Sequence, residues 1–296
     1  MRFIFLMLAA LAYAGAKGQT FDKKRYDSLS TVFHKGTLSF RELPWMVKKA
    51  EKFGQPEKTK LFADRFTVLL LARLDSLGYR KADIQLVREH THSANDPGFG
   101  LFLERADKVD MALGSEGQAR AQVEYVIARD EIDAKIWPNG SAISGSPDWE
   151  SYRRNIIRKY GKGYDERAIL GAQVRWYQAQ KDEQNFIRYQ LQFIERYGMD
   201  LDVVYRRAIW NNFLYNSVFK HSTDRAQLEK ALLFSKRIVD MEPKTASYID
   251  TYANLLYKLE RKIEALEWQE KAYAIAPLDR DISNALELMR AGKKTW

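Results

Sequence analysis

The sequence predicts an all-α protein built as an array of helical hairpins. After the first twenty residues, apolar positions recur at helical spacing, and no run shows the strict alternation of a half-buried strand. Two features near the C-terminus repeat after 34 residues: Ala231 with Ala265, and Pro243 with Pro277. A small residue lets two helices touch and a proline ends the second helix, so this period is typical of stacked helical hairpins.

The first residues, MRFIFLMLAALAYAGAKGQT, predict a secretory signal peptide over 1–18. One basic residue, Arg2, precedes an apolar run from Phe3 to Ala14, and small residues follow it. The run is shorter than the roughly 18 residues that span a membrane. We therefore expect cleavage and export, to the periplasm or outside the cell, with no integral membrane segment in the mature chain. An uncleaved anchor or a buried N-terminal helix is the alternative, and the cleavage site stays open.

Composition narrows the classes of function. The chain has no cysteine, which removes thiol catalysis, disulfides and a lipoprotein anchor, so we expect a soluble protein. The formal charge is +9, but basic and acidic residues are interleaved, for example over residues 130–135 and 260–264. Mixed charge of this kind is typical of solvated helix faces rather than of a nucleic-acid-binding surface.

Residues 19–145 are expected to form degenerate helical hairpins. Ser39 and Glu42 have the spacing of a capping box, with Leu43 as the alternative helix start, and Gly54 is a suitable helix stop. Further helices of this half are expected over about 58–77, 99–113 and 123–136.

Residues 146–296 are expected to form more regular helical repeats. Turn residues fill 137–147, a possible seam, although we expect one continuous helical body. Helices are predicted from Trp149 to Tyr160, around Ile169 to Tyr177, and from Phe186 to Tyr197. The last repeats form a pair over about 212–279, followed by a capping helix near 280–291.

The unit from Ala246 to Asp279 resembles a tetratricopeptide repeat. Ala253, Ala265 and Ala272 fall on its three small-residue positions. The resemblance implies a right-handed solenoid with a concave face, irregular in the N-terminal half. The preceding unit, about 212–245, keeps Ala231 and Pro243 but carries the larger residues Phe219 and Ile238 at two small positions, so we expect different packing there.

A longer stretch is similar to the helical C-terminal region of exported bacterial thioredoxin-like proteins. The segments that carry this resemblance are Asp224, Leu228–Leu232, Tyr248–Leu259 and Trp268–Ala272. The chain lacks the Cys-x-x-Cys motif and has no room for a thioredoxin fold, so the resemblance implies the helical appendage without the redox function.

In tetratricopeptide arrays the first helices of successive units line a concave face that binds peptides or partner helices. When the two C-terminal units are aligned with the tetratricopeptide pattern, we expect six exposed residues on this face: Asn216, Lys220, Asp250, Asn254, Tyr257 and Lys258. The set resembles part of a carboxylate clamp, but Asp281 and Ala285 stand where the third unit of such a clamp is basic. The alternative is that these residues pack against the N-terminal half.

Two other groups bear on enzymatic chemistry. His90 and His92 lie in a polar loop near Glu89 and Asp96, residue types that can bind a metal ion, although a solvated loop explains them equally. The acidic group Asp130, Glu131 and Asp133 has an exposed helix face as its ordinary explanation. The aromatic residues, among them Trp149, Trp176, Tyr177, Trp210, Tyr252 and Trp268, are interpreted as helix packing rather than as a carbohydrate-binding surface.

The sequence thus predicts an exported, non-catalytic helical-repeat protein of the bacterial envelope, acting as a scaffold or as a protein- or peptide-binding module. We expect no catalytic residues, metal, cofactor or nucleic-acid partner. Two alternatives stay open. One is an accessory to envelope thiol-redox proteins, and the other is a metal-assisted hydrolase that uses the loop around His90 and His92.

Overall fold

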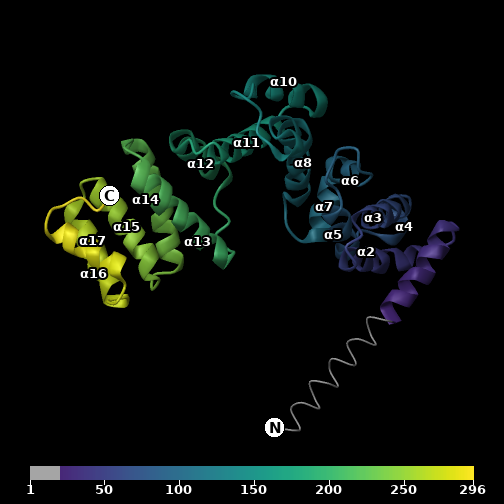
Figure 1. Cartoon of the computed structure of the whole chain (residues 1–296), viewed down its shortest axis with the longest axis horizontal. Helices are drawn as coiled ribbons and strands as arrows, with labels where there is room; N and C mark the ends of the chain where they lie inside the picture. Colours follow the sequence, from purple (N-terminus) through teal and green to yellow (C-terminus); the bar gives the residue numbers. More distant parts are fainter. Residues whose placement is uncertain (1–20) are drawn as a thin grey trace, which may run out of the picture. The chain divides into compact units, whose positions relative to one another are not determined.

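The computed structural model describes residues 21–296, and the predicted signal peptide lies outside the described residues. The described chain consists of helices, turns and loops without a strand, which confirms the all-α fold class (Figure 1). No helix among these residues carries an apolar stretch long enough to reach across a bilayer. The chain divides into two compact units between Pro147 and Asp148, here called unit 1 and unit 2.

Unit 1 opens with a helix over residues 21–34. Its later α-helices are α2 (Leu43–Lys52), α3 (Pro56–Leu71), α4 (Leu74–Leu77), α5 (Lys81–Glu89), α6 (Phe99–Glu104), α7 (Ala106–Leu113), α8 (Gln118–Ala128) and α9 (Ala134–Ile136). Short 3-10 turns η1 (Phe40–Glu42) and η3 (Pro138–Gly140) and the π-helical segment η2 (Arg129–Asp133) complete it.

The hairpin of α2 and α3 organises the first part of unit 1. Ser39 accepts a hydrogen bond from the N–H of Arg41 and caps η1, so α2 itself starts at Leu43, the alternative start. Gly54 closes the hairpin with a φ of 64°, a left-handed conformation that glycine adopts without strain. The expected helix over 58–77 is two helices, because α3 ends at Leu71 and α4 follows.

Unit 2 contains the longer and more regular helices. They are α10 (Trp149–Tyr160), α11 (Asp165–Ala179), α12 (Glu183–Tyr197), α13 (Val204–Phe213), the π-helical segment η4 (Leu214–Phe219), α14 (Arg225–Met241), α15 (Ala246–Lys258), α16 (Lys262–Ile275) and α17 (Arg280–Arg290). Aspartate carboxylates cap four of them by accepting hydrogen bonds from first-turn N–H groups, at Asp148, Asp182, Asp224 and Asp279.

The helices of the expected repeat pair end where the prolines require. Helix α14 ends at Met241 and α16 ends at Ile275, each two residues before its proline. The expected capping helix is α17. Ala253, Ala265 and Ala272 are fully buried where α15 and α16 pack together. The solenoid arrangement of the whole array stays a prediction.

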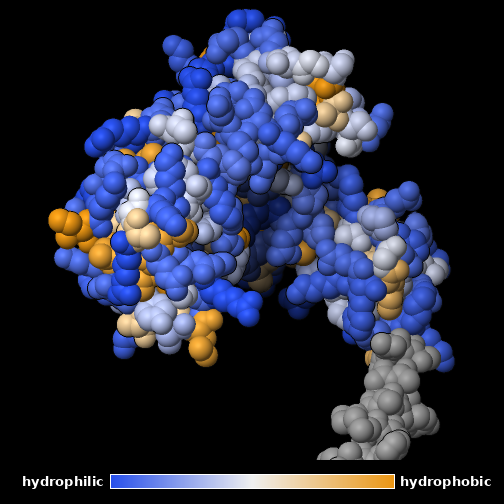
Figure 2. Space-filling view, turned by 60° about the vertical axis from the view of Figure 1, so that its left-hand side comes forward, coloured by the Kyte–Doolittle hydropathy of each residue, from blue (hydrophilic) through white to orange (hydrophobic). Residues whose placement is uncertain are grey.

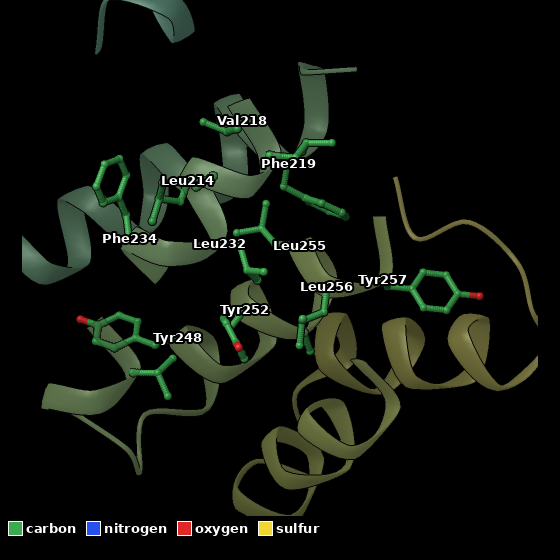
Figure 3. Packing of buried hydrophobic residues seen from close by; sticks show 14 of the residues in the cluster. Leu214, Val218, Phe219, Leu232, Phe234, Tyr248, Tyr252, Leu255, Leu256 and Tyr257 are labelled. Carbon is green, nitrogen blue, oxygen red and sulfur yellow. The ribbon is translucent and has the colours of Figure 1, made fainter. Parts of the chain in front are cut away.

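The core of unit 2 surrounds α15. Leu214, Val218 and Phe219 from η4 converge with side chains of α14 and α15 (Figure 3). Ten consecutive residues of α15, from Tyr248 to Tyr257, are buried, whereas an ordinary amphipathic helix buries one face. The face seen in Figure 2 is mostly hydrophilic, with hydrophobic residues in small separate groups.

Because α15 is enclosed on several sides, its polar residues lie inside unit 2. The Nε2 group of Gln269, a fully buried residue, donates to Oδ1 of Asp250 at 2.6 Å and to the carbonyl of Ile282 at 3.1 Å. Burial raises the pKa of Asp250 to about 6, even though the hydrogen bond from Gln269 opposes this rise. The buried Oε1 of Gln269 and Oδ1 of Asn254 have no hydrogen-bond partner.

We expect Asp250→Asn to stabilise the protein above pH 6. The native carboxyl binds its proton more tightly than the unfolded one, whose pKa is near 3.8. The protonated carboxyl therefore stabilises the folded protein fully below pH 3.8, and this stabilisation falls as the pH rises towards 6. At pH 8 the buried, ionised carboxylate lowers the free energy of unfolding by up to about 3 kcal/mol. Urea unfolding of both proteins at pH 4 and pH 8 measures this difference. The control is Asp240→Asn, because Asp240 is an exposed carboxylate that pairs with Lys236. Equal stability of wild type and Asp250→Asn at pH 8 would contradict the prediction.

Candidate functional site

The residues expected on a concave face do not share one exposed surface. Asp250, Asn254 and Tyr257 are 7%, 1% and 3% exposed, so the expectation of exposure is wrong for these three. The reason is cover by α17: the hydroxyl of Tyr257 donates to the carbonyl of Met289 at 3.4 Å, and Gln269 joins Asp250 to Ile282. Their partners lie within unit 2.

The other three expected residues keep some exposure. Lys220 donates to Oδ1 of Asn216 at 3.1 Å, and both side chains are exposed. Lys258 is half-buried, donates to the carbonyl of Phe219, and lies 5.1 Å from the ring centre of Trp296. Ligand binding through these residues stays a prediction, and none of them faces a cavity described below.

The histidine loop borders a polar cleft of about 790 Å³ in unit 1. The Nε2 atom of His90 is buried and lies 3.5 Å from the carboxylate of Glu51. Burial lowers the pKa of His90 although the charge of Glu51 opposes this, so the imidazole is neutral at pH 7. His92 and Arg129 also line the cleft.

The nearby carboxylates hold the loop in place. Asp96 accepts hydrogen bonds from the N–H groups of His92 and Ser93 and from Lys60 at 2.6–2.8 Å. Asp130 accepts from the hydroxyl of Ser93 at 2.9 Å and from the N–H of Ala94 at 2.7 Å. Within residues 21–296 no three His, Cys, Asp or Glu side chains are placed to hold a metal ion. Of the groups near the loop, Asp96 and Asp130 bind the loop itself, whereas Nε2 of His90 makes no hydrogen bond.

We expect Asp130→Ala to loosen this loop. Ala94 and Ser93 lose their acceptor, which costs about 1–3 kcal/mol of stability, and the amide of Ala94 exchanges its hydrogen faster. Denaturant unfolding and hydrogen exchange measure the two effects. Asp107→Ala, at an exposed position of α7, is the control. Unchanged exchange at Ala94 would show that Asp130 does not hold the loop.

Unit 2 contains a groove that the sequence does not single out. We call it the α13 groove: a cavity of about 440 Å³ lined by Gln178, Phe186, Gln190, Arg206, Ile209, Trp210, Asn212, Phe213 and Ser217. These residues come from α11, α12, α13 and η4. Trp210 was expected to be a packing residue, and nothing in its spacing distinguishes a core position from a groove wall.

One wall of the α13 groove is apolar. The rings of Phe186 and Phe213 meet edge to face at 5.5 Å. Ile209 is 55% exposed, and Tyr205, one turn earlier on the same side of α13, is 61% exposed. The apolar surface therefore extends from the groove along the outer side of α13.

The groove also contains polar groups without a protein partner. The indole Nε1 atom of Trp210 is buried and donates to no acceptor. Gln190 is 9% exposed, and its amide makes no hydrogen bond within the described part of the chain. The same is true of the polar side-chain groups of Gln178, Asn212 and Ser217. Of these groups, the Trp210 indole N–H is buried, whereas Gln178 and Asn212 are exposed. Buried polar groups in proteins are normally hydrogen-bonded, so the unpaired indole N–H next to exposed apolar side chains marks the α13 groove as the candidate binding site.

Comparisons of the chain with protein-family models, curated proteins and solved structures found no match. The resemblances to tetratricopeptide repeats and to the helical region of thioredoxin-like proteins therefore stay predictions. Any proposal of function rests on the residues and geometry described above.

Proposed function

We propose that the protein is an exported, non-catalytic binding module that holds a protein partner at the α13 groove. The observation that carries this proposal is the combination, at one groove, of exposed apolar side chains and the unpaired indole N–H of Trp210. Each of these features costs free energy in the isolated protein, and a partner that covers both removes both costs.

The energetic argument has two parts. Exposed apolar surface such as Tyr205 and Ile209 gains roughly 25 cal/mol for each Å² that a partner covers. The buried indole N–H of Trp210 has lost its water without gaining an acceptor, a cost of about 1–3 kcal/mol that a ligand acceptor relieves. Tryptophan, tyrosine and arginine are also the residue types that contribute most at protein interfaces, and Arg206 lines the groove.

The groove offers little for catalysis. Its lining holds no carboxylate and no imidazole, the groups that most often transfer protons in active sites. Its one ionisable side chain, Arg206, stays protonated at any physiological pH and lies 3.4 Å from Asp200. This chemistry supports binding rather than reaction. The predicted signal peptide supports the exported location.

We expect a photo-crosslinking amino acid at position 209 to capture a partner in cells of the source organism. Position 209 lies in the groove wall, so a bound partner is within reach of the probe. The same probe at position 233 is the matched control, because Leu233 is 64% exposed on α14 of the same unit but does not line the groove.

The expected result is a product of defined mass from position 209 that is absent from position 233 and disappears when Tyr205→Asp is added. Equal labelling from both positions indicates non-specific contact and contradicts the proposal. No product from position 209 contradicts it as well.

A further inference from the structure

We infer that unit 2 contains a second binding site, on η4 and α15, which a segment of this chain fills as a self-ligand. The segment is Lys293–Trp296, which follows α17, and the site is formed by Phe219, Tyr257 and Lys258. A partner segment with an acidic, an apolar and an aromatic residue in succession fits this site better and displaces the self-ligand. None of the three site residues lines the α13 groove, so the inference goes beyond the proposed function.

The indole ring of Trp296 fills the site. It meets the rings of Phe219 and Tyr257 edge to face, with ring centres 6.2 and 6.4 Å away. The Nζ atom of Lys258 lies 5.1 Å from the centre of the same indole ring. Phe219 and Tyr257 belong to the core, one from η4 and the other from α15 (Figure 3). Trp296 therefore completes an aromatic cluster that begins in the core of unit 2.

This one side chain does most of the holding. The N–H of Lys293 donates to the carbonyl of Leu288 at 2.9 Å, and beyond it the backbone of residues 294–296 makes no hydrogen bond within the described part of the chain. Trp296 is itself 39% exposed. A segment with few buried contacts and no backbone pairing opens at a low free-energy cost, so a competing segment can take its place.

Lys258 lacks a negative partner in the filled site. Its ammonium group is half-buried and donates to the carbonyl of Phe219, but within residues 21–296 it forms no ion pair. The self-ligand instead brings Lys294, whose Nζ atom lies 5.5 Å from the same indole ring. Burial and the charge of Lys294 both lower the pKa of Lys258, because each disfavours its cation. An acidic residue in place of Lys294 turns this repulsion into attraction.

Thr295 is the second poor fit of the self-ligand. Its Oγ1 atom is buried and has no hydrogen-bond partner. A hydroxyl group in this position has lost its water without compensation, whereas a methyl group of similar size has nothing to lose. The preferred occupant is therefore an acidic residue, a valine and an aromatic residue in succession. The corresponding segment of a second copy is excluded as this occupant, because it brings the same Lys294 and Thr295.

The test uses the full chain with Trp296→Ala, which empties the site, and a labelled, amidated peptide Gly-Lys-Glu-Val-Trp followed by fluorescence anisotropy. We expect this peptide to bind Trp296→Ala at least tenfold more tightly than it binds the wild type, in which the self-ligand competes. The matched control is Tyr273→Ala, because Tyr273 is 37% exposed on α16 of the same unit, and it should behave as the wild type does. Circular dichroism and thermal unfolding identify any loss of fold.

Two comparison peptides test the two poor fits. Gly-Lys-Lys-Val-Trp should bind Trp296→Ala about fivefold more weakly, and the difference should shrink at high salt, which screens charge. The native segment, Gly-Lys-Lys-Thr-Trp, should bind more weakly still. Adding Lys258→Met should remove the preference for Glu over Lys. Adding Lys236→Met instead, at a lysine of α14 that pairs with Asp240, should leave this preference unchanged.

A further variant tests the charge argument with the site filled. Lys294→Glu in the full chain should tighten the self-ligand and raise the melting temperature, whereas Lys293→Glu, at the exposed neighbouring position, should not. Because it keeps Trp296, this comparison decides the matter even where Trp296→Ala fails to fold. Equal melting temperatures of the two variants would contradict the inference.

Other outcomes overturn it as well. Equal binding of the Glu peptide to the wild type and to Trp296→Ala would show that Trp296 does not fill a binding site. Absence of binding to folded Trp296→Ala at millimolar concentration would show that the emptied surface binds no such segment. Equal binding of the native segment and the Glu peptide would assign the site to a second copy of the chain, and a preference for Glu that survives Lys258→Met would exclude Lys258 as its cause.

Discussion

The close approach of α15 to its neighbours is the constraint on which the packing of unit 2 depends. Ala231, Ala253, Ala265 and Ala272 are fully buried, and their small side chains let helix backbones come near enough for larger residues around them to interdigitate. A larger residue at Ala253 would push α15 away from α16. The enclosure of α15 also carries Asp250, Asn254 and Gln269 into the interior, where Gln269 donates to Asp250 while one oxygen of Asn254 and one of Gln269 stay unpaired.

Unlike α15, helix α13 is mostly not buried. Asn211 is its one buried residue, whereas the π-helical segment that follows buries Leu214, Val218 and Phe219. A π-helical turn has a wider hydrogen-bond spacing than an α-helical turn, which shifts the side-chain direction along the chain. Residues before η4 thus supply most of this part of the groove lining, together with Ser217, while Leu214, Val218 and Phe219 of η4 enter the core. The same continuous helical stretch supplies both a binding surface and the packing that holds it in place.

The sequence predicts the fold class because helical periodicity is a local signal. The proline and glycine positions also mark helix ends, as at Pro243, Pro277 and Gly54. The break between α3 and α4 is not predicted, because the apolar pattern continues through residues 71–74 and only tertiary contacts end the helix there.

The candidate site is much less predictable. Asp250 and Asn254 have the residue types of a solvated face, and the helix that covers them, α17, becomes a cover only in three dimensions. Ile209 and Trp210 have the spacing of ordinary core residues, and no local signal shows that neighbouring helices leave them uncovered. The sequence allows two interpretations of the histidine loop, a metal site or a solvated loop. Loop geometry decides between them, because Asp96 could bind either a metal ion or the N–H groups of its own loop.

The state of the Trp210 indole tests the central claim most directly. A ¹⁵N–¹H correlation spectrum of protein labelled at tryptophan, with the Trp210 signal assigned from Trp210→Phe, reports whether this N–H is paired. The account predicts an N–H without a protein acceptor in the free protein, and a large downfield shift on adding the purified partner that crosslinks at position 209, while the Trp268 signal stays fixed. A Trp210 signal already typical of a strong hydrogen bond, and unmoved by the partner, would contradict the account.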